Sequence, residues 1–166
     1  MARIIGMGGN RWKHLSDDDS AVWALFQTKV NLDGWSQEYD VELGRESMTD
    51  IEVDPVNAKL WHSLRQKRAD VVLKRGTEVR LIELKRRATS SALGQLLSYR
   101  HLYNNNPANP YPCSGWLICL TVDDDLVPLF DGYGFGTVEM LNPARPLNVQ
   151  REWGRVVSTT NQPEPR

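Results

Sequence analysis

Residues 68–87, "RADVVLKRGTEVRLIELKRR", constrain the fold most, because two apolar, β-branched segments flank a short turn sequence. "ADVVL" and "VRLIEL" have the composition of buried strands, and "KRGT" between them contains the glycine that a tight turn needs, so the stretch predicts a β-hairpin. Asp70 and Glu83 lie inside these expected strands. A buried carboxylate is costly to desolvate, so each should have a cation, a set of hydrogen bonds or a metal ion as its partner.

The position of the turn decides whether the two carboxylates meet. If the hairpin turns at residues 75–76, paired residue numbers sum to about 151, and Arg68 lies opposite Glu83. Asp70 and Glu83 are then diagonal neighbours on one face, roughly 5 to 8 Å apart, and Lys85 follows on that face. A shift of one residue would send the carboxylates to opposite faces of the sheet.

Two carboxylates and a lysine on one face suit metal-dependent hydrolysis. Carboxylate oxygens are ligands that Mg²⁺ prefers, and such an ion lowers the pKa of a bound water and neutralises charge on a phosphate. Lys85 would then orient or deprotonate the attacking water and stabilise the oxyanion. The open alternative is a buried network in which Arg68 and Lys85 neutralise Asp70 and Glu83 with no metal.

Basic residues gather around the same stretch. The formal net charge of the chain is −1, yet residues 59–87 contain ten of its 20 Lys and Arg residues and three acidic residues, a local excess of seven positive charges. Such an excess suits a phosphate backbone, and a solvated basic face is the alternative.

The other segments predict further helices and strands. Apolar side chains at helical spacing follow a run of Ser and Asp before residue 20, and a nearly continuous apolar run at residues 114–122 is typical of a strand covered on both faces. By the same reasoning we expect helices over residues 18–30, 54–66, 89–103 and 123–134, and strands over residues 35–43, 114–122 and 135–141.

Asp70 followed by "ELK" at residues 83–85 has the order of acidic residues and lysine found in the PD-(D/E)XK nucleases. "RADVVL", "IELKRR", "GQLLSYRHLY" and "GWLICLTVDDDLVPLFDGYGFGTVEML" then occur in order, and over residues 66–141 they resemble the nuclease domain of the NucS/EndoMS family. The resemblance implies an α/β, restriction-endonuclease-like fold with a mixed central β-sheet flanked by helices. Carried over, the metal ligands are Asp70 and Glu83, and the catalytic set is Asp70, Glu83, Lys85 and Gln95.

The function that this resemblance implies is metal-dependent hydrolysis of DNA phosphodiester bonds, with Mg²⁺ or Mn²⁺ as cofactor and DNA as partner. The candidate DNA-binding residues are Arg68, Arg86, Arg87, Tyr99 and Arg100. The chain has no room for the separate domain that these enzymes use for dimerisation and DNA binding. A second hypothesis is therefore a nuclease-like structural or DNA-binding component of a larger assembly, such as a virus particle, with little or no hydrolysis. A small dimer would suit the enzyme, and a ring or larger assembly the structural role.

Other acidic residues have two interpretations. Many nucleases of this superfamily place an acidic residue on the first helix, and Asp18 or Asp19 could take that role, although helix capping by residues 17–19 is favoured. Capping is also the expected role of residues 123–125, which precede an apolar helical stretch. The alternating acidic residues of 38–42 suit a solvated strand edge.

Length and composition predict one domain. With 166 residues, of which 40% are hydrophobic, the chain can form one compact core. We place this domain at residues 1–150 and a polar, Pro-rich tail at residues 151–166. No segment approaches the roughly 18 apolar residues of a membrane span, so we expect a cytoplasmic protein with no membrane partner. A viral or phage-encoded protein fits the same expectation. Cys113 and Cys119 should be buried, reduced thiols.

Overall fold

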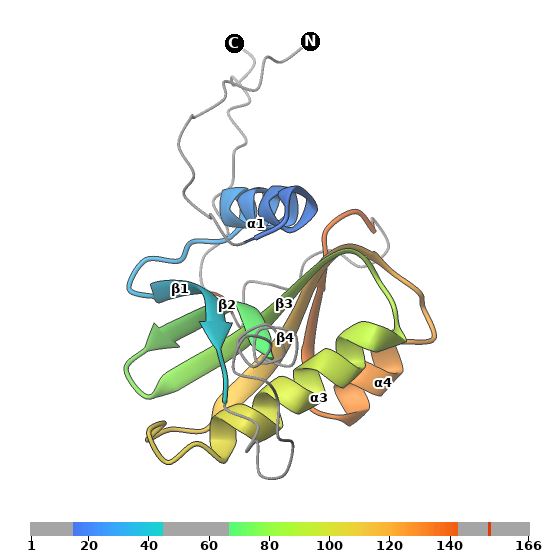
Figure 1. Cartoon of the computed structure of the whole chain (residues 1–166). Helices are drawn as coiled ribbons and strands as arrows, with labels where there is room; N and C mark the ends of the chain where they lie inside the picture. Colours follow the sequence, from blue (N-terminus) through green and yellow to red (C-terminus); the bar gives the residue numbers. More distant parts are fainter. Residues whose placement is uncertain (1–14, 45–66, 143–152, 154–166) are drawn as a thin grey trace, which may run out of the picture.

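The computed structural model describes residues 15–44, 67–142 and 153, and its centre is a five-stranded sheet (Figure 1). Strands β1, β2 and β3 pair antiparallel, β3, β4 and β5 pair parallel, and their order in the sheet is the order of the chain. The elements are α1 (Asp17–Lys29), β1 (Ser36–Glu42), β2 (Arg68–Arg75), β3 (Glu78–Ala88), α3 (Ser90–Asn104), β4 (Cys113–Val122), α4 (Val127–Gly132) and β5 (Gly136–Glu139). This mixed sheet flanked by helices confirms the predicted α/β fold class. The helix expected over residues 54–66 lies outside the described residues.

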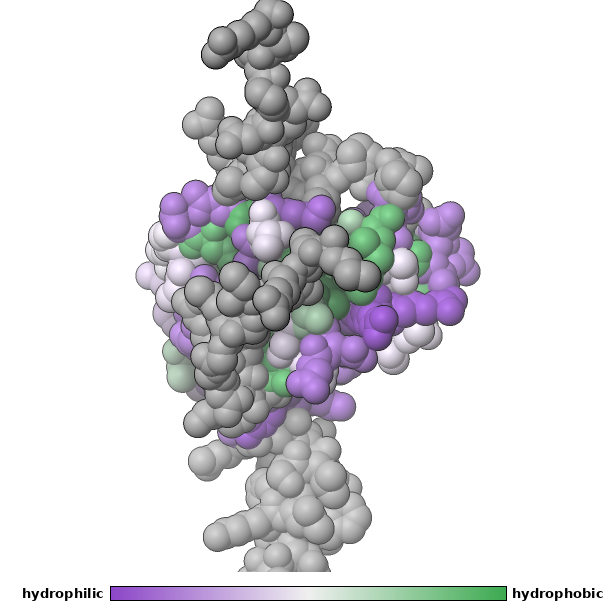
Figure 2. Space-filling model, turned by 90° about the horizontal axis from the view of Figure 1, so that it is seen from above, coloured by the Kyte–Doolittle hydropathy of each residue, from purple (hydrophilic) through white to green (hydrophobic). Residues whose placement is uncertain are grey.

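Helices cover both faces of the sheet. Trp23 and Phe26 of α1 pack with Ile82 on one face, and Leu96 of α3 packs with Leu117 on the other. Because both faces are covered, β2, β3 and β4 need apolar side chains on both sides, which explains their nearly continuous apolar sequences. Seen from above, the described surface has a mostly hydrophilic rim with smaller hydrophobic areas (Figure 2). Of the helices that the structure describes, none combines the length and apolar character needed to cross a membrane.

The turn of the β2–β3 hairpin lies one residue later than predicted. Arg75 pairs with Glu78, so Gly76 and Thr77 form the turn instead of Arg75 and Gly76. Gly76 has a φ of 59°, which glycine adopts without steric penalty and which suits the first central position of a two-residue hairpin turn. Each strand partner is therefore two positions away from its predicted one, and since the side-chain period of a strand is two residues, every side chain keeps its predicted face.

The helices begin for different local reasons. Ser16 caps α1, and its hydroxyl accepts a hydrogen bond from the Asp19 backbone N–H at 3.1 Å. Thr89 caps α3 without a side-chain hydrogen bond. The capping role expected of residues 123–125 is wrong, because Leu126 occupies the N-cap of α4 and no acidic residue lies in its first turn.

Trp153, which belongs to the predicted tail, is buried on the α1 face of the sheet. Its ring lies edge-on to Phe26 at 5.2 Å and to Trp116 at 4.7 Å between centroids. The Arg80 guanidinium lies 4.2 Å from the Trp153 ring centroid and 4.7 Å from that of Trp35. Aromatic pairs and a desolvated cation over aromatic rings both stabilise such a cluster, so Trp153 is part of the core.

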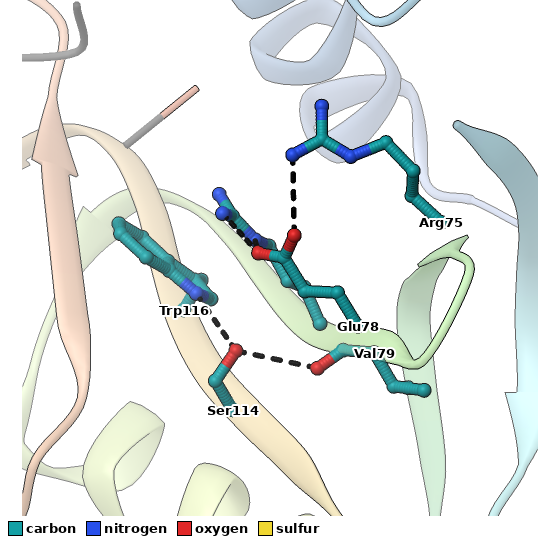
Figure 3. A network of polar contacts seen from close by, with 6 residues as sticks. Arg75, Glu78, Val79, Ser114 and Trp116 are labelled. Atoms are coloured by element: carbon teal, nitrogen blue, oxygen red, sulfur yellow. Dashed lines mark hydrogen bonds and ion pairs between the residues drawn. The ribbon is translucent and has the colours of Figure 1, made fainter. Parts of the chain in front are cut away.

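A polar network that includes Arg75, Glu78, Ser114 and Trp116 lies next to this aromatic cluster (Figure 3). Glu78 forms one ion pair with Arg80 and a second, at 3.1 Å, with Arg75. On β4, Trp116 Nε1 donates a hydrogen bond to Ser114 Oγ at 3.1 Å, and Ser114 Oγ donates in turn to a β3 backbone carbonyl at 3.3 Å. The network stabilises the end of the sheet at which the hairpin turns.

Replacing Trp153 with alanine should lower the free energy of unfolding by about 3–5 kcal/mol, because the core loses a fully buried aromatic ring. Urea denaturation followed by circular dichroism measures the change. Tyr111→Ala is the control, since Tyr111 is 43% exposed and its replacement should change stability by less than about 0.5 kcal/mol. Small and equal effects in both variants would contradict the packing of Trp153 in the core.

Candidate active site

Asp70 and Glu83 lie beside each other where the β2–β3 ladder ends. Val71 and Ile82 form the last pair of that ladder, and continuing the register by one residue places Asp70 opposite Glu83. The two carboxylates are therefore direct neighbours instead of the predicted diagonal ones. Here a side-chain hydrogen bond replaces the backbone ladder: Asp70 Oδ2 accepts a hydrogen bond from the Leu84 N–H at 2.7 Å.

The β1–β2 ladder is also interrupted beside Asp70. The register of the flanking pairs places Asp40 opposite Asp70, but Asp40 has a φ of 52° and is skipped in the pairing. A non-glycine residue in the left-handed region disrupts the ladder locally and redirects its side chain. Within the described strands, Asp70 thus lies between two breaks in the backbone ladder. At one of them its carboxylate accepts the Leu84 N–H.

Glu83 is fully buried. Lys85 Nζ forms an ion pair with its Oε1 atom. Neither carboxylate oxygen of Glu83 has a well-directed hydrogen bond from the described residues, although Lys85 and the Tyr99 hydroxyl lie close enough to lower its pKa. The Lys85 contact is an ion pair, whereas the Tyr99 hydroxyl is a neutral neighbour of the carboxylate. Buried polar atoms are normally hydrogen-bonded, so the Glu83 oxygens retain unused capacity to accept a further ligand.

Burial raises the pKa of both carboxyl groups. Desolvation and the neighbouring Glu83 carboxylate raise the pKa of Asp70 to about 8, against the lowering effect of the Leu84 N–H. Desolvation also raises the pKa of Glu83, and Lys85 and Tyr99 offset this only in part. The pair therefore retains a proton near neutral pH, which a bound cation would displace.

Lys85 is held as a cation in this cluster. Burial by itself lowers the pKa of its amine, but the Glu83 carboxylate, with smaller contributions from Asp70 and Asp19, outweighs burial and raises that pKa. The side chain is 28% exposed, so the amine lies between the buried carboxylates and solvent. A charged group in this position can contact both the acidic pair and an incoming anion.

Helix α3 contributes Gln95 and Tyr99, which lie one turn apart on the same helix face. Gln95 Nε2 donates a hydrogen bond to the Tyr99 hydroxyl at 3.4 Å. Burial and the Glu83 carboxylate raise the pKa of Tyr99, so its hydroxyl stays neutral. Because Tyr99 is buried against the carboxylates, its position does not suit the DNA contact expected from the sequence.

Asp19 of α1 belongs to the same electrostatic cluster. Its charge raises the pKa of Asp70 and of Glu83. The Ser16 hydroxyl donates a hydrogen bond to Asp19 Oδ2 at 2.6 Å, so the same residue takes part in helix capping. Among the residues that the structure describes, no group of three or more His, Cys, Asp or Glu side chains is arranged to hold a metal ion, and the candidate ligands are the Asp70–Glu83 pair.

Two of the predicted DNA-binding arginines make internal contacts. Arg68 Nη1 lies 2.6 Å from Asp40 Oδ2, so the alternative in which Arg68 neutralises Glu83 is wrong. Its actual partner lies on β1, because the observed register moves Arg68 two positions away from Glu83 along the strand. Arg100 donates a hydrogen bond to the Tyr133 carbonyl at 2.7 Å, which ties α3 to the segment after α4.

The other two predicted arginines, Arg86 and Arg87, are exposed at the end of β3, directly after Lys85. Arg86 forms an ion pair with Asp18, and Arg87 forms one with Asp123. Neither acidic partner was predicted from the sequence. Composition gives no signal for them, because each partner is far from its arginine in the chain.

The fold is similar to that of a solved structure. No family model matches the sequence, and no curated protein matches it. The solved structure is described as "Structure of EndoMS-dsDNA2 complex" and is similar with a TM-score of 0.46 and 16% sequence identity. The match covers 83% of this chain and 51% of the other, so this chain spans about half the length of that one.

The raised pKa of Asp70 predicts a pH-dependent stability. Between about pH 4, where the unfolded carboxyl titrates, and about pH 8, the folded state holds a proton that the unfolded chain has released, so stability falls as pH rises. The free energy of unfolding of the wild type should fall across this window by at least about 1 kcal/mol more than that of Asp70→Asn.

Urea denaturation at both ends of the window measures this difference. Asp131→Asn, which changes an exposed carboxylate on α4, should keep the pH dependence of the wild type. Identical pH profiles for the wild type and Asp70→Asn would contradict the raised pKa of Asp70.

Proposed function

We propose that the protein is a metal-dependent deoxyribonuclease that hydrolyses DNA phosphodiester bonds at Asp70, Glu83 and Lys85. The observation that carries the proposal is the fully buried Glu83 carboxylate next to Asp70, with Lys85 as its ion-pair partner. When all three groups are ionised, two carboxylates and one amine leave one negative charge in excess. Buried excess charge is unfavourable, and the raised pKa values of both carboxyls express this.

The residues fit a divalent cation with oxygen ligands. Asp70 uses one oxygen for the Leu84 N–H, and both oxygens of Glu83 lack a well-directed hydrogen bond from the described residues. Mg²⁺ commonly binds through one or two carboxylates and keeps several waters. Asp70 and Glu83 would therefore hold Mg²⁺ or Mn²⁺. When bound, such an ion neutralises charge on a phosphate and makes a bound water more acidic.

Lys85 acts as a cation in this proposal. Although burial favours the neutral amine, Glu83 and Asp70 raise its pKa, so it stays protonated at neutral pH. A protonated amine would orient the attacking water and stabilise the charge that develops on the phosphate oxygens. Of the three roles expected from the sequence, orientation of water and charge stabilisation fit this protonated amine, and removal of a proton from water does not.

Gln95 and Tyr99 would orient the acidic pair. Gln95 reaches the cluster through its hydrogen bond to the Tyr99 hydroxyl, and that hydroxyl lies next to Glu83. Because both residues lie on α3, which packs on β3 and β4, they are held by the core. We therefore assign Gln95 a positioning role instead of a direct contact with the substrate.

DNA is the proposed substrate because cations continue the strand that carries the site. Lys85 is followed by the exposed Arg86 and Arg87. Contacts from arginine to phosphate oxygens position a nucleic acid without reading its sequence. The scissile phosphate would approach from the side on which Lys85 is partly exposed.

Lys85→Ala should lower the rate of DNA cleavage by at least about hundredfold, since the charge beside the reacting phosphate is lost. The assay follows labelled single- and double-stranded DNA with Mg²⁺ or Mn²⁺, and EDTA should stop cleavage by the wild type. Lys74→Ala is the matched control, because Lys74 is a half-exposed β2 lysine paired with Glu38 at 2.8 Å, and it should leave the rate unchanged. If the folded wild type cleaves neither substrate with either metal, the structural or DNA-binding hypothesis is favoured.

Metal binding can be measured without activity. Mg²⁺ or Mn²⁺ should raise the Tm of the wild type, because a ligand that binds only the folded state at about a hundredfold excess over its Kd stabilises it by about 2.7 kcal/mol. Glu83→Gln keeps the shape of the side chain but removes its charge, and it should lose this shift. Glu38→Gln, which changes an exposed glutamate on β1, should retain it. A full shift in Glu83→Gln would show that Glu83 is not a ligand.

A further inference from the structure

The two exposed arginines at the end of β3 each form an ion pair with an aspartate that is distant in the sequence. Arg86 Nη1 lies 3.4 Å from Asp18 Oδ1 on α1, and Arg87 Nη2 lies 3.0 Å from Asp123 Oδ1, just after β4. Both arginines directly follow Lys85, and successive side chains of a strand point to opposite faces. By this alternation Arg87 shares the sheet face of Lys85, whereas Arg86 points to the face that α1 covers. The two ion pairs therefore lie next to Lys85 along β3, on opposite sides of the sheet.

Both ion pairs are exposed enough to exchange. The side chains of Arg86 and Arg87 are each 71% exposed, and those of Asp18 and Asp123 are 66% and 49% exposed. Exposed ion pairs contribute little to stability, because water and salt screen them. A phosphate oxygen makes the same kind of charge-assisted contact with a guanidinium group, and a DNA backbone presents many such oxygens together. Phosphate can thus replace either aspartate without disturbing a helix or strand.

Arg68 is held differently. Its side chain is 42% exposed and that of Asp40 is 22% exposed, and Arg68 Nη1 contacts both Asp40 Oδ2, at 2.6 Å, and the Asp40 carbonyl oxygen, at 3.3 Å. The left-handed backbone of Asp40 presents these two acceptors to one guanidinium group. Arg68 therefore has a shielded, two-point contact, whereas Arg86 and Arg87 each have a single exposed one.

We propose that Asp18 and Asp123 are internal competitors of the DNA backbone. In the free protein they occupy Arg86 and Arg87, and phosphate groups displace them when DNA reaches the site, while Arg68 stays paired with Asp40. This inference rests on the proposed function and names the residues that regulate access of DNA to the same site. The competition lowers the affinity for DNA, and it does so most at low salt, where ion pairs are strongest.

The test measures DNA affinity without cleavage. Binding of a short fluorescein-labelled DNA duplex is followed by fluorescence anisotropy in EDTA. Asp18→Asn and Asp123→Asn should each raise the affinity about two- to fivefold near 50 mM salt, because DNA no longer has to break an ion pair. The gain should shrink toward about 200 mM salt, because screening weakens the ion pair in the wild type.

Asp17→Asn and Asp125→Asn are the matched controls. Both residues are exposed, and each substitution removes the same charge close to the tested aspartate. Asp17→Asn also removes one acidic residue from the first turn of α1, as Asp18→Asn does, so any effect on helix stability is matched. Each control should change DNA affinity by less than about 1.5-fold, because the ion-pair partners of Arg86 and Arg87 in the described residues are Asp18 and Asp123. Equal gains in controls and test variants would overturn the proposal.

Arginine-deleted backgrounds separate ion-pair exchange from net charge. In an Arg86→Ala protein, Asp18→Asn should raise the affinity no more than Asp17→Asn does, because the arginine that Asp18 occupies is gone. In an Arg87→Ala protein, Asp123→Asn should likewise match Asp125→Asn. A gain that persists in either background would show that the aspartate acts through overall charge, and the proposal would fail.

The outcomes also separate this proposal from the nuclease activity. Tighter binding by Asp18→Asn and Asp123→Asn, together with no cleavage by the wild type, would support the competition and refute the nuclease. If the wild type cleaves DNA but all four aspartate variants bind DNA alike, the nuclease is supported and the competition is refuted. If the wild type binds no DNA across the salt range, both proposals fail.

Discussion

The ion pair between Lys85 and the buried Glu83 carboxylate is the interaction on which the candidate site depends. Apolar cores on both faces of the sheet exclude water from this carboxylate. Its charge is therefore weakly screened and interacts strongly with neighbouring ionisable groups. Desolvation and then that charge raise the pKa of Asp70 and of Tyr99, and the charge keeps Lys85 protonated. Burial and the charge of this glutamate thus set the protonation of the cluster together, and a bound cation would change it.

The mixed sheet makes this arrangement possible because its antiparallel half positions the two carboxylates and its parallel half positions α3. The antiparallel half brings Asp70 beside Glu83 through a two-residue turn, and its ladder ends where the Asp70 carboxylate accepts the Leu84 N–H. The parallel half needs a crossover, which α3 supplies, and that helix brings Gln95 and Tyr99 over the same strand face. Basic residues then continue β3 beyond the site, where they meet solvent.

The grouping of Asp70, Glu83 and Lys85 could be predicted because the three residues lie on two strands of one hairpin. Asp70, Glu83 and Lys85 share a face for any register that differs from the true one by two positions, so the misplaced turn did not separate them. The expected partner of Arg68 was wrong for the same reason, since a two-position error changes which residue lies directly opposite. The capping role of residues 123–125 failed because Leu126 occupies the N-cap of α4.

By itself, the sequence determined the helices and strands of the described residues, the faces of the strands and the acidic pair, because side-chain alternation and turn chemistry act over a few neighbouring residues. Only the tertiary structure decided which charges meet across the sheet. Arg86 pairs with a residue 68 positions away and Arg87 with one 36 positions away, and Trp153 enters the core from the predicted tail. Such partners depend on how whole elements pack. Burial then decides the protonation of Asp70 and Glu83, because desolvation exists only after the sheet is covered.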